Sequence, residues 1–193
     1  MSEYNLTKEQ ARRVKDHNLD YFKDNNFYPE IKQNILNYAV SLGKIDIIKY
    51  YMEQGVKVTS SLATSDLMRR NAKIDTLEYL ESHGVEIATN VFLLVAIKAQ
   101  NLKFSQFLAP KVTDFDSFSL KTSIKFSIES FLDLPKASKV FDCLLKKISS
   151  EDLNQLLSEI DDNKFKDKKT FVFNEFLKIH LPDNKVKTKR IKI

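Results

Sequence analysis

The sequence predicts an all-α protein built from short, repeated helical units. The chain of 193 residues is 42% hydrophobic, which is enough for a sizeable core. It has only three Gly and four Pro, too few turn residues for a β-sandwich or a β-barrel. Apolar residues recur at helical spacing along most of the chain. The segment 43–58 recurs as 72–87 with matching positions, which is typical of stacked structural units.

The first 28 residues predict an N-terminal helix. Thr7-Lys8-Glu9-Gln10 has the pattern of a capping box, in which the Thr and Gln side chains each bind a backbone amide of the first turn. Apolar side chains from Ala11 to Phe22 follow helical spacing, and Asp24-Asn25-Asn26 is expected to end the helix. Pro29 suits the first turn of the next one, because its missing amide hydrogen is not needed there.

Two copies of one pattern follow. The equivalent positions are Ile45/Ile74, Asp46/Asp75, Ile48/Leu77, Gly55/Gly84 and Val56/Val85. This spacing gives a short helix with one apolar face, and the glycine beyond its end supplies a left-handed C-cap. A unit this small cannot bury its apolar face alone, so neighbouring copies are expected to stack into a continuous core.

Residues 34–58 resemble an ankyrin repeat. The positions that carry the resemblance are Leu36, Ala39, Gly43, Ile45, Asp46, Ile48, Tyr51 and Gly55. Residues 63–87 resemble a second copy and 92–108 a third, which lacks both glycines. No copy has the Thr-Pro-Leu-His opening of the family, and a fourth copy within 120–146 requires an insertion. The resemblance implies a helical-repeat solenoid that binds another macromolecule.

The predicted organisation has four parts. An N-terminal helix occupies residues 1–28 and an ankyrin-like repeat stack occupies 29–148. Capping helices follow in 149–182, with a helix start at 149–152 and a linker at 161–164. Residues 183–193 form a basic tail.

No catalytic residue, metal ligand or cofactor site is predicted. His17, His83 and His180 have no metal-ligand spacing, and the only cysteine, Cys143, is interpreted as a buried structural residue on an apolar helix. Asp46 and Asp75 near helix starts favour the helix dipole. An acid/base pair is the alternative for these two, and a metal role is the alternative for Asp161-Asp162.

Composition also bears on location. A single cysteine fits a reducing, cytoplasmic setting. The longest apolar run, Val91 to Ile97, is too short to span a bilayer, so no membrane association is predicted. Abundant Lys, Asn, Ile and Phe with no Trp is typical of AT-rich genomes, such as those of phages, viruses and intracellular bacteria. A protein from such a source is expected to act inside the host cell.

The net charge of +5 is concentrated near the C-terminus. From Lys164 onward there are ten Lys/Arg against three Asp/Glu, and residues 1–163 carry 21 against 23. The candidate nucleic-acid contacts are Lys185, Lys187, Lys189, Arg190 and Lys192. A solubilising tail, or a strand added to a partner, are the alternatives. Elsewhere, the candidate contacts to a protein partner are Arg69 and Arg70, at the end of the first helix of the second copy, and Lys98.

The predicted function is that of a non-catalytic protein whose helical-repeat surface binds a protein partner such as a host factor, with inhibition of that partner as one outcome of binding. Nucleic-acid binding by the basic C-terminal segment is the alternative.

Deleting residues 183–193 tests that alternative. If the tail binds phosphates, the affinity for DNA and RNA falls and its dependence on salt becomes shallower, because fewer counterions are released. A salt titration of binding by both chains measures the slope. An equal slope, or no binding by the full chain, contradicts the nucleic-acid hypothesis.

Overall fold

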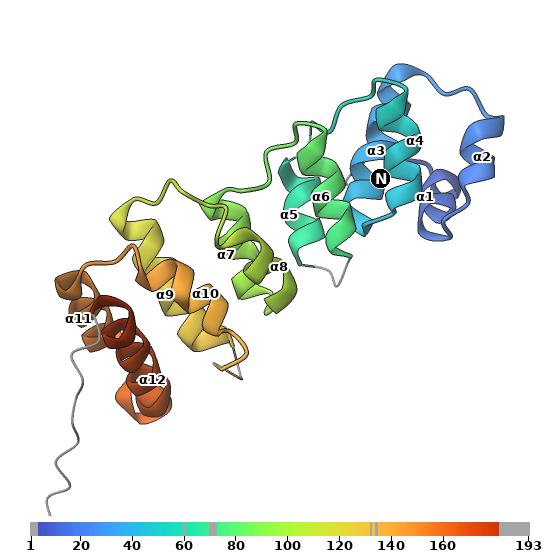
Figure 1. The fold of residues 1–193 in the computed structure, drawn as a ribbon. Coiled ribbons are helices and arrows are strands. Elements are labelled where there is room, and N and C mark those ends of the chain that lie inside the picture. Colours follow the sequence, from blue (N-terminus) through green and yellow to red (C-terminus); the bar gives the residue numbers. More distant parts are fainter. Residues whose placement is uncertain (1–3, 60, 70–72, 132, 134, 182–193) are drawn as a thin grey trace, which may run out of the picture. The chain divides into compact units, whose positions relative to one another are not determined.

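A computed structural model describes residues 4–59, 61–69, 73–131, 133 and 135–181 (Figure 1). All regular secondary structure in these residues is helical, which confirms the prediction of an all-α protein. The chain divides into two compact units, Met1–Asp114 and Phe115–Ile193. This boundary falls inside the range 29–148 that the sequence assigns to one stack.

The N-terminal unit consists of helices that pack on near neighbours in the chain. They are α1 (Lys8–Lys15), α2 (Leu19–Asp24), α3 (Pro29–Leu42), α4 (Ile45–Glu53), α5 (Ser61–Met68), α6 (Ile74–Ser82), α7 (Asn90–Lys98) and α8 (Leu102–Leu108). Helix α3 packs on α4 and α5, α5 packs on α7, and α8 packs on α6 and α7 (Figure 1). We call α3, α5 and α7 the inner helices and α4, α6 and α8 the outer helices.

The prediction of one N-terminal helix in residues 1–28 is wrong, because the chain turns at His17 between α1 and α2. His17 has φ 59°, in the left-handed region. Its amide donates to Val14, the Asn18 amide to Arg13 and the Leu19 amide to His17, at 3.0–3.1 Å. The capping box predicted at Thr7 is present at the start of α1.

The same turn joins the helices of two later pairs. Gly43 between α3 and α4 has φ 66°, and Gln100 between α7 and α8 has φ 56°. At each, the turn amide donates to the carbonyl three residues back and the next amide to the carbonyl five back, at 2.9–3.0 Å. These bonds satisfy carbonyls that the end of a helix leaves without partners. The pair α1/α2 therefore has the same connection as the pairs α3/α4 and α7/α8.

The outer helices α4 and α6 end as the sequence predicts. Gly55 and Gly84 have φ 83° and 78°, and their amides donate to Met52 and Glu81 at 2.9 and 3.0 Å. Apart from the glycine itself and the two adjoining residues, no heavy atom lies within 4 Å of the position that a Cβ would take at Gly55 or Gly84. Backbone conformation, and not space, is therefore what favours glycine at these turns.

The core of the N-terminal unit lies between the inner and outer rows. Its fully buried side chains include Ile35, Leu36, Ala39, Ile47, Ile48, Leu67, Leu77, Leu80, Leu93, Ile97, Phe104 and Leu108. Burial of each large aliphatic side chain contributes about 1.5–3 kcal/mol. They come from every helix between α3 and α8, so each pair depends on its neighbours.

The pair α1/α2 covers one end of this core. Helix α1 packs on α3. Phe22 of α2 is 1% exposed and lies edge-on to Tyr51 of α4, with ring centroids 6.2 Å apart. The Tyr50 hydroxyl donates to the Phe22 carbonyl at 3.4 Å. Burial raises the pKa of the Tyr51 hydroxyl, which keeps this contact uncharged.

The C-terminal unit contains α9 (Ser117–Ser130), α10 (Ser138–Leu145), α11 (Ser150–Glu159) and α12 (Asp162–His180). Helix α9 packs on the other three, and α10 packs on α12. The linker predicted at residues 161–164 is wrong: Asp161 is the N-cap of α12, and its carboxylate accepts the Asn163 amide at 2.9 Å.

Helix α12 caps the ends of two neighbouring helices. Lys168 Nζ donates to the carbonyls of Ile128 and Phe131 at 3.0 and 2.7 Å, and burial lowers the pKa of Lys168. His180 Nε2 lies 2.8 Å from the Leu145 carbonyl oxygen. A basic group at the C-terminus of a helix binds carbonyls that have no partner within the helix. These contacts fix α12 along α9 and α10.

Substituting Gln100→Gly tests the left-handed turn. Glycine adopts φ near 56° without steric cost, so the free energy of unfolding should rise by roughly 0.5–1 kcal/mol. Lys103→Gly, inside α8, is the control and should lower it by a similar amount. Urea denaturation followed by circular dichroism measures both. Equal losses in the two variants would contradict the assignment.

Candidate binding groove in the N-terminal unit

A hollow of ≈ 890 Å³ lies across the loops that follow α4 and α6 and the start of α7. We call it the loop groove. Its lining residues are Met52, Gly55, Val56, Lys57, Val58, Thr59, Thr64, His83, Gly84, Val85, Glu86, Thr89, Asn90, Val91 and Phe92. Three chain segments and one residue of α5 therefore build it. Most of the exposed surface of its lining is apolar.

Helix α3 holds the first of these loops in place. The Gln33 amide donates to the Lys57 carbonyl. Asn37, only 7% exposed, donates to Thr59 Oγ1 and accepts the Thr59 amide, both at 3.4 Å. A buried amide side chain is costly unless it is hydrogen-bonded, so Asn37 favours a single position of the loop. The conformation of the groove wall is thus coupled to the core.

An equivalent tether holds the loop after α8. Asn90 Nδ2 donates to the Asp114 carbonyl at 3.4 Å, and Asn90 and Asp114 are 24 residues apart, as are Gln33 and Lys57. Asn90 also lines the groove. The hydrogen bond from the inner helix to the following loop and the left-handed turn therefore both recur. This recurrence indicates that the first and third copies are built alike.

The start of α7 exposes an apolar side chain at the groove. The Thr89 hydroxyl caps the helix by accepting the Phe92 amide at 3.2 Å. Both Val91 and Phe92 line the hollow, but Phe92 is only 9% exposed, whereas Val91 is 62% exposed. A large apolar side chain exposed beside an apolar hollow is a common feature of binding surfaces.

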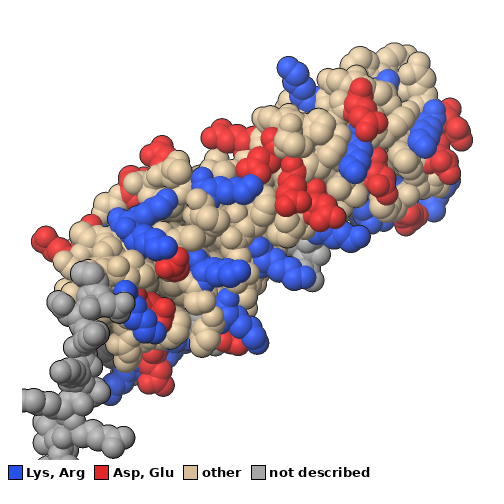
Figure 2. All heavy atoms as spheres, in the orientation of Figure 1, with Lys and Arg blue, Asp and Glu red and all other residues tan. Residues whose placement is uncertain are grey.

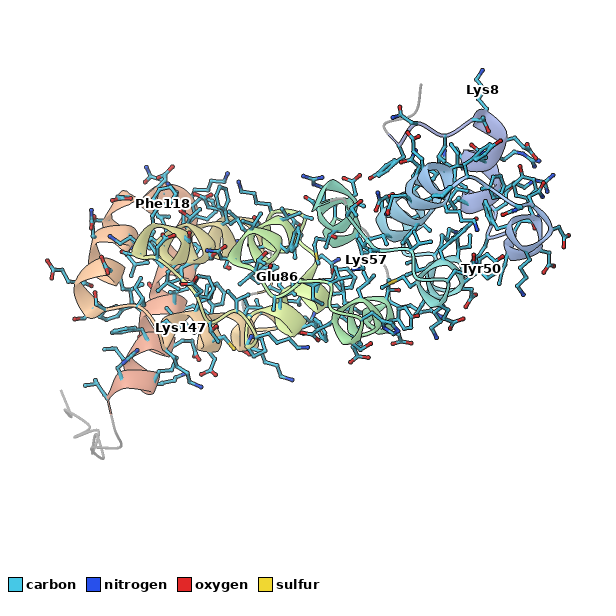
Figure 3. The ribbon with its side chains drawn as sticks, turned by 90° about the horizontal axis from the view of Figure 1, so that it is seen from above. Lys8, Tyr50, Lys57, Glu86, Phe118 and Lys147 are labelled. Carbon is cyan, nitrogen blue, oxygen red and sulfur yellow. The ribbon has the colours of Figure 1, made fainter. Side chains whose placement is uncertain are left out.

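Two charged residues of opposite sign lie on the successive loops. Lys57 and Glu86 occupy equivalent positions, two residues after Gly55 and Gly84, and both are exposed. Figure 3 shows them on neighbouring loops. Neither forms an ion pair with another residue in the described part of the chain. Their charges are therefore available to a bound molecule.

The candidate contacts from the sequence lie elsewhere or outside the described residues. Arg69 follows the last residue of α5 and pairs with Asp66 at 2.8 Å, and Lys98 is exposed in the last turn of α7. Neither lines the groove. Arg70, Lys185, Lys187, Lys189, Arg190 and Lys192, and with them the basic tail, lie outside the described residues.

Charges of both signs are mixed over the face shown in Figure 2. Long stretches of positive charge are what non-specific binding to a phosphate backbone requires. The described surface in this view therefore adds nothing to the nucleic-acid alternative.

The histidines contact nearby protein groups. His17 Nε2 lies 3.2 Å from Asp46 Oδ2, which joins the first turn to α4. His83 stacks on Tyr79 with ring centroids 4.0 Å apart, and its Nδ1 lies 2.9 Å from the Tyr79 carbonyl oxygen. Asp46 and Asp75 lie in the first turns of α4 and α6, where the sequence places them.

The sequence predicts a buried structural cysteine at position 143, and the structure corrects this, because Cys143 is only partly buried. Burial, with a contribution from Asp142, raises the pKa of its thiol, which disfavours the reactive thiolate. Within the described ranges, no three His, Cys, Asp or Glu residues are grouped so as to hold a metal ion. None of the helices in these ranges combines the length and apolar composition needed to cross a bilayer.

No protein-family model, curated protein or solved structure matches this chain. The function must therefore be inferred from the geometry of the groove. Sequence reasoning missed the groove, although two signals for it were present. Val56 and Val85 coincide in the repeat, and Lys57 and Glu86 carry opposite charges at the next equivalent position.

Proposed function

We propose that the chain is a non-catalytic, ankyrin-like helical-repeat protein that binds a protein partner through the loop groove. The observation that carries the proposal is the apolar lining of this solvent-open hollow, with Val91 62% exposed beside it. Covering such a surface gains about 25 cal/mol per Å² of apolar area. A partner that fills the groove therefore gains affinity by covering apolar surface that the free chain leaves exposed.

The recurrence of structural detail supports an ankyrin-like repeat. The left-handed turns at His17, Gly43 and Gln100 have the same hydrogen bonds, and the tethers from Gln33 and Asn90 have the same sequence separation. Repeats built this way present equivalent loops side by side, which is how such proteins form extended binding surfaces.

A binding role also accounts for the titratable groups. Asp46 pairs with His17, the Leu145 carbonyl lies beside His180, and the Cys143 thiol is held in its neutral form. The neighbours of His17, His180 and Cys143 have structural roles, whereas a nucleophile or a general base requires neighbours that activate it. Because the composition is typical of AT-rich genomes such as those of phages, viruses and intracellular bacteria, we propose that the partner is an intracellular host protein. Binding in the groove masks a segment of this protein and thereby inhibits it.

Substituting Val91→Glu tests the groove. A charge in the apolar hollow should weaken partner binding by at least about tenfold, because the carboxylate must lose its hydration on binding. Phe118→Glu is the matched control. Phe118 is also the second residue of its helix, is 78% exposed and belongs to the C-terminal unit.

The partner is first identified by mass spectrometry after affinity purification with the full chain. Its Kd for the two variants and the unmodified chain is then measured by calorimetry with purified proteins. Loss of affinity in Val91→Glu alone supports the proposal. Equal affinity of Val91→Glu and the unmodified chain would rule out the groove as the binding surface.

A further inference from the structure

We infer that the loop groove takes an extended polypeptide segment in which an apolar side chain lies between an acidic residue, facing Lys57, and a basic residue, facing Glu86. This inference rests on the proposed function and specifies the chemistry of the ligand. Three features of the groove carry it: unpaired backbone groups, an apolar lining and two unpaired charges.

The backbone of the loops favours an extended ligand. The Lys57 carbonyl and the Thr59 amide are held by α3. The backbone amides and carbonyls of Val58 and Glu86 have no hydrogen-bond partner among the described residues. An extended polypeptide has free main-chain groups that can pair with them, whereas those of a helix are already paired within the helix.

The lining favours an apolar side chain at the centre of the segment. Met52, Val56, Val85, Val91 and Phe92 contribute to one hollow of ≈ 890 Å³. This volume is in the range of about 300–1,000 Å³ found for ligand sites. Gly55 and Gly84 at the ends of α4 and α6 have open space where a side chain would begin, so they leave the approach to the hollow clear.

The two charges give the segment a direction. Lys57 and Glu86 lie on successive loops, both are exposed, and neither has an ion-pair partner in the described ranges. A segment with an acid near Lys57 and a base near Glu86 is attracted at both ends, and the reversed segment is repelled. Each exposed pair changes affinity by a factor of up to about five. The order of charges thus favours one direction of the bound segment.

The inference is tested with a phage-displayed library of random linear peptides. The library is selected on the full chain, on the Lys57→Glu/Glu86→Lys double variant and on Lys139→Glu/Glu159→Lys. The last is the matched control, because it exchanges two exposed charges of the C-terminal unit and also leaves the net charge unchanged. Circular dichroism confirms that all three are equally folded.

The unmodified chain and the control should select an apolar residue flanked by an acid and a base in one order. The double variant should select the opposite order, with roughly fivefold or greater preference over the original peptides. Selection of the same order by all three, or flanks without charge, overturns the inference.

The peptides are also tested against Val91→Glu, which separates failure of this inference from failure of the proposed function. One result is that peptides bind the unmodified chain and the Lys57→Glu/Glu86→Lys variant with equal affinity but lose binding to Val91→Glu. That result overturns the charge assignment and leaves the groove as a binding site. Peptides that bind Val91→Glu as well as the unmodified chain overturn both.

Discussion

The left-handed turn between the two helices of a pair is the constraint on which the N-terminal unit depends. At His17, Gly43 and Gln100 one residue with positive φ reverses the chain and closes the same hydrogen bonds. A left-handed conformation costs a residue with a Cβ about 1–2 kcal/mol. Two of the three turns bear this cost, and burial of the paired helices in a shared core offsets it. The short turn makes the helices antiparallel neighbours, which brings their apolar faces together.

The groove follows from that pairing. Because each outer helix ends near the start of the next inner helix, successive loops come to lie beside one another, and Gln33 and Asn37 fix the first of them to α3. The backbone groups that remain unpaired, at Val58 and Glu86, are on loops held by a rigid helical core. A surface built this way is preorganised, so a ligand loses less conformational entropy when it orders the site.

Much of this fold is predictable from the sequence, and the exceptions have physical reasons. Gly43, Gly55 and Gly84 mark helix ends because glycine favours positive φ, but His17 and Gln100 take the same conformation without that signal. The apolar spacing from Ala11 to Phe22 continues through the turn, so α1 and α2 look like one helix.

Side-chain interactions explain the other differences. The acidic and polar residues at Asp161–Lys164 suggest a loop, yet an aspartate is also a good N-cap. The groove combines three segments whose arrangement depends on the Gln33 and Asn37 amides, and periodicity does not report such contacts. The pairing of Arg69 with Asp66 depends likewise on side-chain geometry.

Hydrogen exchange with and without a saturating selected peptide tests the central claim most directly. If the loop groove binds an extended segment, the backbone amides of Val58 and Glu86 exchange more slowly in the complex, because they gain partners that the free chain lacks. Amides in residues 115–181 should exchange at unchanged rates. Slower exchange confined to residues 115–181, with none in the two loops, would contradict the assignment of the groove.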